Sequence, residues 1–160
     1  MNFKVFIRNI FIVMFATLML SACATKTATL PSQIQGDVYT GTDTVEYLAK
    51  GVPDRVFFAT NESVLTTASR DTLRKQAAWM RANDSLSFTI EGHADERGTR
   101  EYNLALGERR ANAAKDYLMT YGISGNRLSV ISYGKERPVN SGSNPLAWSQ
   151  NRRSVTVKAN

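Results

Sequence analysis

The sequence contains very little cysteine and histidine, two residue types that commonly bind transition metals. It has one cysteine and one histidine in 160 residues. A single cysteine cannot form a disulfide within the chain, so a folded domain must be stable through core packing alone. His93 alternates with Glu91 and Asp95, which leaves a metal-dependent hydrolase as an alternative. No second histidine completes such a site and no nucleophile turn is recognisable, so we expect no enzyme and no cofactor.

The sequence also lacks an early apolar run long enough to cross a membrane comfortably. Residues 10–20 form an eleven-residue stretch interrupted only by Thr17, whereas a spanning helix needs about 20 apolar residues. Lys4 and Arg8 precede the stretch, and no acidic residue occurs before residue 23. This pattern is typical of a secretion signal, and an uncleaved anchor is the weaker alternative.

The chain's cysteine, Cys23, follows Leu20-Ser21-Ala22 at the end of that stretch. Small residues before a cysteine resemble the lipobox of bacterial lipoproteins, which implies that Cys23 becomes the acylated first residue of the mature protein. The alternative is an ordinary signal peptide that leaves a free thiol. The lipobox reading implies an outer-membrane location facing the periplasm, because Ala24 replaces the aspartate that retains many lipoproteins in the inner membrane.

Three segments are therefore expected along the chain. Residues 1–22 form a lipoprotein signal peptide, residues 23–50 a lipidated N-terminus with a flexible tether, and residues 51–160 the folded domain. The tether is rich in Thr, Ser, Gln and Gly up to residue 42, a composition that buries too little apolar surface to order itself. Residues 44–50 predict one short turn of helix before Gly51 and Pro53 end it.

The chain carries a formal net charge of +6, which raises the question of a nucleic-acid partner. Export argues against nucleic acid. It favours an anionic polymer outside the cytoplasm, such as a membrane surface or a cell wall.

Strand and helix patterns alternate in the folded domain. Strict apolar alternation predicts strands, and apolar residues spaced by three and four predict helices. The expected strands cover 56–58, 86–91, 128–133 and 154–158. Three helices are expected: the first begins at Thr66 or Thr67, the second covers 99–121, and the third, a short one, begins at Asn144-Pro145. These elements predict an α/β (α+β) fold, a two-layer sandwich whose mixed β-sheet carries helices on one face while its other face is polar and wet.

An arginine interrupts the apolar stripe of the second helix. Arg110 lies four residues after Leu106 and three before Ala113, both of which belong to the inward face. A buried guanidinium needs a partner, because leaving it unpaired costs several kcal/mol. The partner is either a carboxylate in a structural salt bridge or an anion received in a pocket.

The polar segment 91–99 precedes this helix and follows a predicted strand. Ligands of α/β proteins commonly bind at the carboxyl ends of strands. Gly98 can adopt a positive φ that lets the segment fold back, so that Asp95 approaches Arg110. The alternative is an ordinary charged surface loop.

Residues 91–118 closely resemble the central motif of OmpA-like peptidoglycan-binding domains. Within this family the chain most resembles the peptidoglycan-associated lipoproteins of the Tol system, which also share the segments 132–138 and 151–153. The resemblance spans about residues 54–158, and the lipobox and tether agree with it.

The resemblance implies noncovalent binding of the diaminopimelate residue in the stem peptide of peptidoglycan. The position of Asp95 implies a contact with the ligand's amino group, and that of Arg110 a contact with its carboxylate. Further ligand-lining positions match Arg97, Asn103, Leu106 and Phe58. The family's usual aspartates are replaced by Ala59 and Asn61, which removes any side-chain contact they would make. The family also implies TolB as a protein partner, and an adaptor that binds only protein is an alternative.

Overall fold

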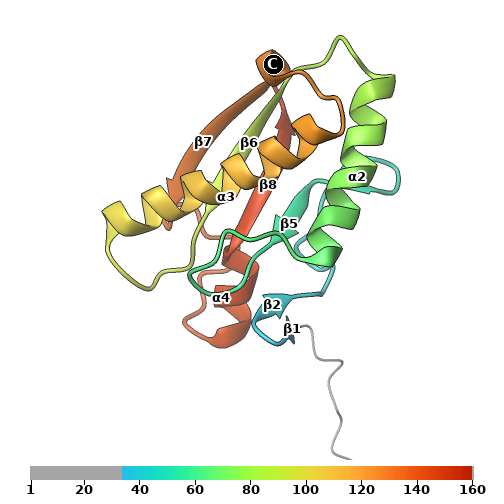
Figure 1. Ribbon diagram of the computed structural model, residues 1–160. Coiled ribbons are helices and arrows are strands. Elements are labelled where there is room, and N and C mark those ends of the chain that lie inside the picture. Colours follow the sequence, from blue (N-terminus) through green and yellow to red (C-terminus); the bar gives the residue numbers. More distant parts are fainter. Residues whose placement is uncertain (1–33, 160) are drawn as a thin grey trace, which may run out of the picture. The chain divides into compact units, whose positions relative to one another are not determined.

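The computed structural model describes residues 34–159 of the chain (Figure 1). The predicted signal peptide, the lipidation site at Cys23 and the first part of the predicted tether lie outside the described residues.

The centre of the fold is a four-stranded mixed sheet in the order β5-β8-β6-β7 (Figure 1). Its strands are β5 (Arg55–Phe57), β6 (Phe88–His93), β7 (Leu128–Gly134) and β8 (Arg153–Lys158). β6 and β7 run parallel, whereas β8 is antiparallel to both β5 and β6. The carboxyl ends of β5, β6 and β7 and the beginning of β8 therefore lie at one end of the sheet.

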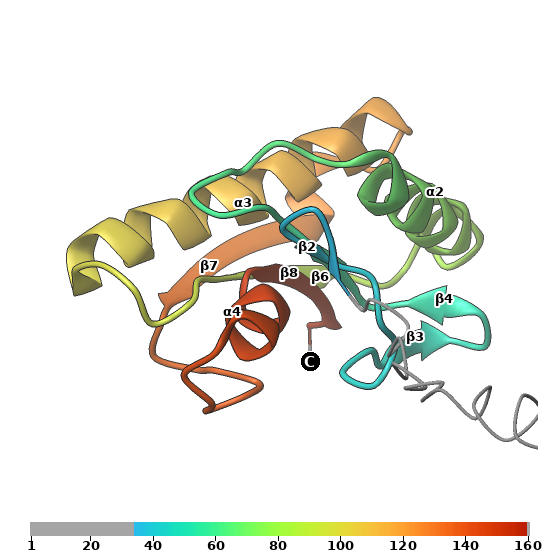
Figure 2. The same cartoon turned by 90° about the horizontal axis from the view of Figure 1, so that it is seen from below.

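Two long helices, α2 (Thr67–Ala82) and α3 (Arg100–Thr120), cover one face of this sheet (Figure 2). The core between helices and sheet contains the apolar residues Val56, Phe58, Leu73, Ala77, Met80, Phe88, Ile90, Ala111, Ala114, Leu118, Ile123 and Leu128. The predicted two-layer fold with a mixed sheet and helices on one face is confirmed.

Local capping explains where the helices begin. The side chains of Thr66, Thr99 and Asn144 each accept a hydrogen bond from the backbone N–H three residues later. This cap satisfies a backbone donor that the first helical turn leaves free. The short helix α4 (Pro145–Asn151) begins with its proline as predicted, and a 3₁₀ turn, η1 (Gly125–Arg127), connects α3 to β7.

The second face of the sheet differs from the predicted wet surface. Arg55, His93, Arg153 and Val155 are buried there. Arg153 donates a hydrogen bond from Nη2 to the carbonyl of Arg137 at 3.2 Å, so the segment after β7 covers part of this face. The apolar alternation of β6 correctly predicts which of its residues face the helices. It does not predict that the segment after β7 covers part of the opposite face.

The described part of the predicted tether is also folded. It contains the hairpin of β1 (Ile34–Gln35) with β2 (Val38–Tyr39), and β3 (Tyr47–Ala49) pairs with β4 (Val52–Pro53). The predicted turn of helix at 44–50 is therefore wrong, because pairing with β4 makes these residues extended. Tyr39 is buried with its ring edge against Phe57, at 4.8 Å between centroids. Within residues 34–159, the helices are too short or too polar to span a bilayer.

Candidate ligand-binding site

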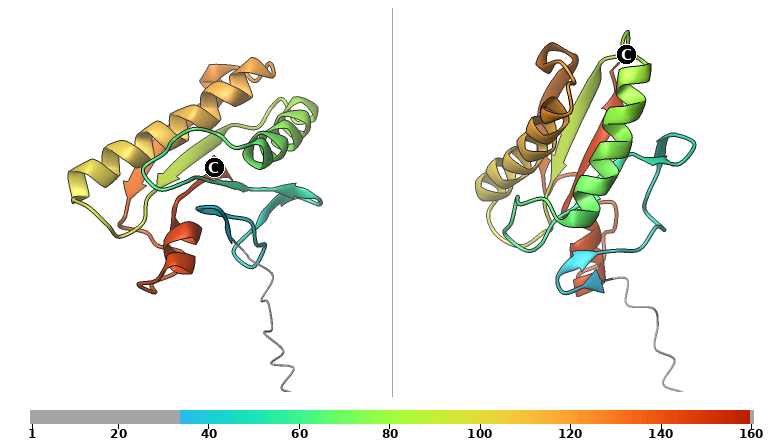
Figure 3. Two further views of the ribbon diagram at one scale, coloured as in Figure 1. Left: turned by 60° about the horizontal axis from the view of Figure 1, so that its bottom comes forward. Right: turned by 45° about the vertical axis from the view of Figure 1, so that its right-hand side comes forward.

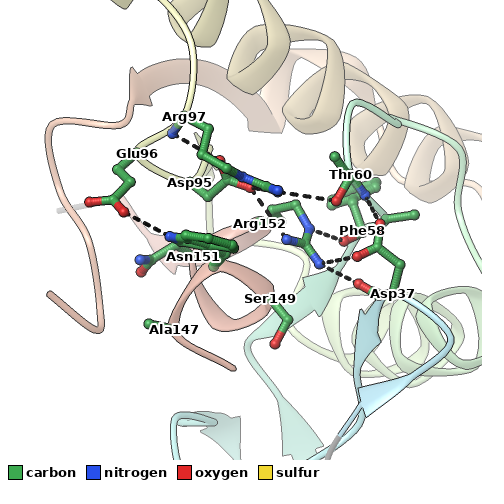
Figure 4. Close-up of polar contacts among 12 residues, drawn as sticks. Asp37, Phe58, Thr60, Asp95, Glu96, Arg97, Ala147, Ser149, Asn151 and Arg152 are labelled. Carbon is green, nitrogen blue, oxygen red and sulfur yellow. Dashed lines mark hydrogen bonds and ion pairs between the residues drawn. The ribbon is translucent and has the colours of Figure 1, made fainter. Parts of the chain in front are cut away.

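The residues predicted to bind a ligand converge at the end of the sheet where β5, β6 and β7 finish. Phe58 directly follows β5, Asp95 and Arg97 follow β6, and Arg110 belongs to α3. Figure 4 shows the polar contacts of this end of the molecule. The turn after β6 doubles back through Gly98, whose φ is +90°. The structure thus places these residues at one end of the sheet, with the segment folded back as their approach requires.

Asp95 is a buried carboxylate held by two arginines. Its Oδ1 accepts hydrogen bonds from the backbone N–H and the Nε of Arg97, both at 3.1 Å. Its Oδ2 accepts from Arg97 Nη2 at 2.7 Å and from Arg152 Nη1 at 3.3 Å. Burial alone would raise the pKa of Asp95, but the hydrogen bonds from Arg97 and Arg152 and the charge of Arg97 outweigh burial and lower it. The carboxylate is therefore ionised at neutral pH.

Arg110 is fully buried, with 0% of its surface exposed. Its Nε, Nη1 and Nη2 donate to the backbone carbonyls of Glu62, His93 and Ala59 at 2.8, 2.8 and 3.0 Å. Burial and the nearby charge of Arg152 lower the pKa of Arg110 to about 10, so it remains charged at neutral pH. A guanidinium has five N–H donors. Three backbone contacts thus hold Arg110 in place while donor capacity remains for an anion.

The structure separates Asp95 and Arg110 into two hydrogen-bond networks. The partners of Asp95 are Arg97 and Arg152, and those of Arg110 are backbone carbonyls. The structural salt bridge considered for Arg110 is not formed with any carboxylate in residues 34–159. One anionic and one cationic group thus lie at this end of the sheet without a direct ion pair between them.

Arg152 is a central residue of the site that sequence reasoning did not select. Only 2% of it is exposed, and it donates from Nε to the carbonyl of Phe58 at 3.1 Å. Its Nη2 donates to Asp37 Oδ1 at 2.8 Å and also to the Asp37 carbonyl. Figure 4 shows the guanidinium between Asp95 and Asp37. The segment 151–153 entered the family resemblance, but nothing in its spacing indicated contact with either aspartate.

The remaining predicted positions pack around these charged groups. Arg97 lies over the Trp148 ring, 4.4 Å from its centroid, and donates from Nη2 to Thr60 Oγ1 at 3.2 Å. Asn103 donates from Nδ2 to the Arg97 carbonyl at 2.8 Å, which holds the turn after β6 against α3. Leu106 and Phe58 are buried, and the Arg110 guanidinium lies 5.4 Å from the Phe58 ring centroid.

The two positions where the family resemblance implies aspartates, Ala59 and Asn61, lie shortly after Phe58. Ala59 contributes its carbonyl to Arg110, a contact that does not depend on the side chain. Asn61 has a φ of +58°, in the left-handed region that asparagine tolerates better than most residues. The backbone of this segment therefore shapes the site despite both replacements.

His93 belongs to the other face of the sheet. Its Nε2 lies 3.4 Å from Glu91 Oε2, and neither ring nitrogen makes a well-formed hydrogen bond within residues 34–159. Burial, with the charges of Arg153, Arg55 and Arg137, lowers the pKa of His93 to about 3 against a small opposing effect of the Arg137 backbone. In the described part of the chain, no three acidic, histidine or cysteine side chains are grouped as metal ligands.

A separate pocket of about 510 Å³ lies between the N-terminal segment, β5 and the start of α2. Its lining includes Val38, Tyr39, Val45, Phe57 and Thr66. None of the residues predicted to bind a ligand lines it. This pocket and the charged groups therefore lie at different places, and the chemistry favours the charged end of the sheet.

Comparisons with known proteins identify the family and the fold. The OmpA family model matches residues 57–152. The peptidoglycan-associated lipoprotein of Brucella melitensis is 46% identical over 151 residues, which cover 91% of this chain and 89% of that protein. That of Rhizobium meliloti is 46% identical over 152 residues, covering 92% and 86%.

Solved structures show the same fold. The crystal structure of the peptidoglycan-associated lipoprotein from Burkholderia pseudomallei has a TM-score of 0.65 and 34% identity, covering 66% of this chain and 90% of that one. The C-terminal domain of MotB from Helicobacter pylori has a TM-score of 0.62 at 18% identity, a likeness of fold alone. The chain belongs to the OmpA family, among the peptidoglycan-associated lipoproteins.

Proposed function

We propose that this protein is a lipid-anchored lipoprotein of the outer membrane, facing the periplasm, that binds the diaminopimelate stem peptide of peptidoglycan noncovalently. It would link the outer membrane to the cell wall within the Tol system, with TolB as a protein partner, and serve envelope integrity and cell division. The observation that carries the binding function is the pair of buried, oppositely charged groups, Asp95 and Arg110, at one end of the sheet.

The two charges suit the two charged groups at the free end of diaminopimelate. Asp95 can accept hydrogen bonds from the ligand's ammonium group, and Arg110 can donate the N–H groups not used by backbone carbonyls to its carboxylate. Each charge-assisted contact is worth about 1.5 to 3 kcal/mol when well aligned. The lowered pKa of Asp95 and the pKa of about 10 of Arg110 keep both groups charged at neutral pH.

Arg97 and Arg152 have a supporting role in this proposal. Both hold the Asp95 carboxylate, so they orient it before the ligand arrives. The hydrogen bond from Arg152 to Asp95, at 3.3 Å, is longer than that from Arg97 Nη2. An ammonium group that approaches Asp95 would therefore bind beside Arg152 or take its place on the carboxylate.

Cosedimentation with purified wall sacculi tests the proposal. Asp95→Asn removes the negative charge with little change in shape, and Arg110→Lys keeps a positive charge but loses the planar fork of donors. We expect each variant to lose most of its retention, by about tenfold or more, since each loses a charge-assisted contact.

Asp116→Asn and Arg109→Lys are the matched controls, because they make the same two changes at exposed positions of α3. We expect both to sediment like the parent. Thermal melting of every variant shows whether it is folded. Normal sedimentation of folded Asp95→Asn and Arg110→Lys proteins would reject the site.

A further inference from the structure

The turn between β1 and β2 brings a carboxylate of the N-terminal segment to the site. Asp37 follows Gly36, whose φ of +62° makes the tight turn. Asp37 Oδ1 accepts from Arg152 Nη2 at 2.8 Å, and its Oδ2 accepts from the Thr60 backbone N–H at 2.5 Å. Figure 3 shows this hairpin beside α4, at the same end of the sheet as the site.

The groups that hold Asp37 belong to the site itself. Arg152 also donates to Asp95, and Thr60 accepts from Arg97 through its hydroxyl. Thr60 directly follows Ala59, the carbonyl of which accepts from Arg110. A guanidinium together with a backbone N–H is a common arrangement for binding a free carboxylate. Asp37 thus lies where a carboxylate of an incoming ligand would find ready donors.

The hairpin that carries Asp37 is short, and it is held mainly through Asp37 and Tyr39. Each of its strands has two residues, and such short two-stranded ribbons are only marginally stable on their own. The Asp37 side chain is 48% exposed, whereas that of Arg152 is 3% exposed. Tyr39, against Phe57, is the buried apolar anchor of the hairpin. Arg152 is thus buried in the folded domain, whereas the Asp37 side chain that it contacts is half exposed to solvent.

We propose that the Asp37 carboxylate occupies a carboxylate-binding position of the site in the free protein, and that a carboxylate of the wall peptide displaces it from Arg152 and the Thr60 N–H. This inference rests on the proposed function. It makes Arg152 a ligand-binding residue and the β1–β2 hairpin an internal competitor. Coupling between two binding events is reciprocal. Detaching the hairpin therefore raises the affinity for the ligand, and binding of the ligand in turn loosens the hairpin.

Calorimetry on the full chain in detergent, with a soluble diaminopimelate-containing stem peptide as the probe, tests the competition. Asp37→Asn removes the competing charge, so we expect binding about tenfold tighter than that of the parent, as the fraction of open sites rises. Asp43→Asn is the matched control. It makes the same charge change in the same segment, but Asp43 contacts Gln150 Nε2 at 3.0 Å rather than Arg152, so its affinity should equal that of the parent.

Amide hydrogen exchange on the parent gives a second readout that needs no variant. We expect exchange at residues 34–39 to become faster when the peptide is added. Unchanged exchange with bound peptide, or a folded Asp37→Asn protein that binds no tighter than the parent, overturns the displacement and leaves the wall-binding function standing. Equal tightening by Asp43→Asn also overturns it, because the effect is then not specific to the Asp37 carboxylate. A parent that binds neither peptide nor sacculi rejects the proposed function and the displacement together.

Discussion

Arg110 and Arg152 are both buried at the same end of the sheet, but their hydrogen bonds differ in kind. Arg110 is held by three neutral backbone carbonyls, and no carboxylate within residues 34–159 contacts it directly. Arg152 contacts the carboxylates of Asp95 and Asp37. A ligand carboxylate therefore gains most from Arg110 as a new counterion, whereas at Arg152 it must compete with one already present.

The lack of a carboxylate in direct contact with Arg110 predicts which cell walls are bound. Lysine in place of diaminopimelate keeps the ammonium group for Asp95 but has no carboxylate for Arg110. The N–H groups of Arg110 that no backbone carbonyl uses would gain no partner, so we expect affinity for a lysine-type stem peptide to be about 100-fold weaker. Calorimetry with the two soluble peptides measures the ratio, and equal affinities would show that Arg110 does not recognise the carboxylate.

His93 predicts a pH dependence of stability that is separate from ligand binding. Its pKa is about 3 in the folded protein and 6.5 ordinarily. Below pH 6.5 the unfolded chain takes up a proton that the folded protein does not, so the free energy of unfolding falls with falling pH by about 1.4 kcal/mol per unit. The stability that comes from keeping His93 neutral is fully present above pH 6.5 and is lost progressively toward pH 3.

Urea unfolding of the parent and of His93→Gln between pH 7.5 and 4.5 measures this contribution. We expect the variant to be less stable at pH 7.5 but to lose the part of the slope that comes from His93. The same slope in both proteins would contradict a buried neutral imidazole.

At the scale of elements, the site depends on the close contact between β6 and α3. A Cβ atom added at Gly92 would lie 1.8 Å from the Gly107 carbonyl oxygen, and one added at Gly107 would lie 2.4 Å from Ser132 Oγ. The backbones of strand and helix therefore touch. Asp95 follows Gly92 by three residues and Arg110 follows Gly107 by three, so this contact sets the distance between the two charges.

Gly107→Ala tests the contact. Alanine in place of glycine within a helix ordinarily stabilises it by about 1 kcal/mol, but here the added methyl group should push α3 from the sheet and destabilise the protein by about 1 to 3 kcal/mol. Sacculus binding should weaken as well. Gly125→Ala is the control, since its Cβ would meet only the flexible Met119 side chain at 3.2 Å. A Gly107→Ala protein of parental stability would show that the helix can move without cost.

The whole molecule can link two layers of the envelope only if its N-terminus is anchored. A single acyl chain gives marginal membrane binding, so the two or more chains expected on a lipoprotein cysteine are needed to hold the folded domain. We expect Cys23→Ser to appear in the soluble periplasmic fraction, whereas Thr25→Ser stays in the outer membrane. Membrane fractionation distinguishes the two, and a Cys23→Ser protein retained as firmly as the parent would contradict lipidation.

By itself, the sequence determined the helices, the strands of the main sheet and the burial of Arg110. These follow from local information: periodicity, capping residues such as Thr99, and an arginine within an apolar stripe. The family motif then predicted that Asp95 and Arg110 lie at the same end of the sheet.

Only the tertiary structure decided the partners of those residues. Arg152 is 115 residues from Asp37 and 57 from Asp95 in sequence, so no local pattern brings the three together. Residues 47–49 are extended because they pair with β4, and residues 34–39 are folded because Tyr39 and Asp37 have partners on β5 and at Arg152. Long-range pairing and burial outweigh weak local preferences in such short segments, which is why the predicted tether contains part of the folded domain.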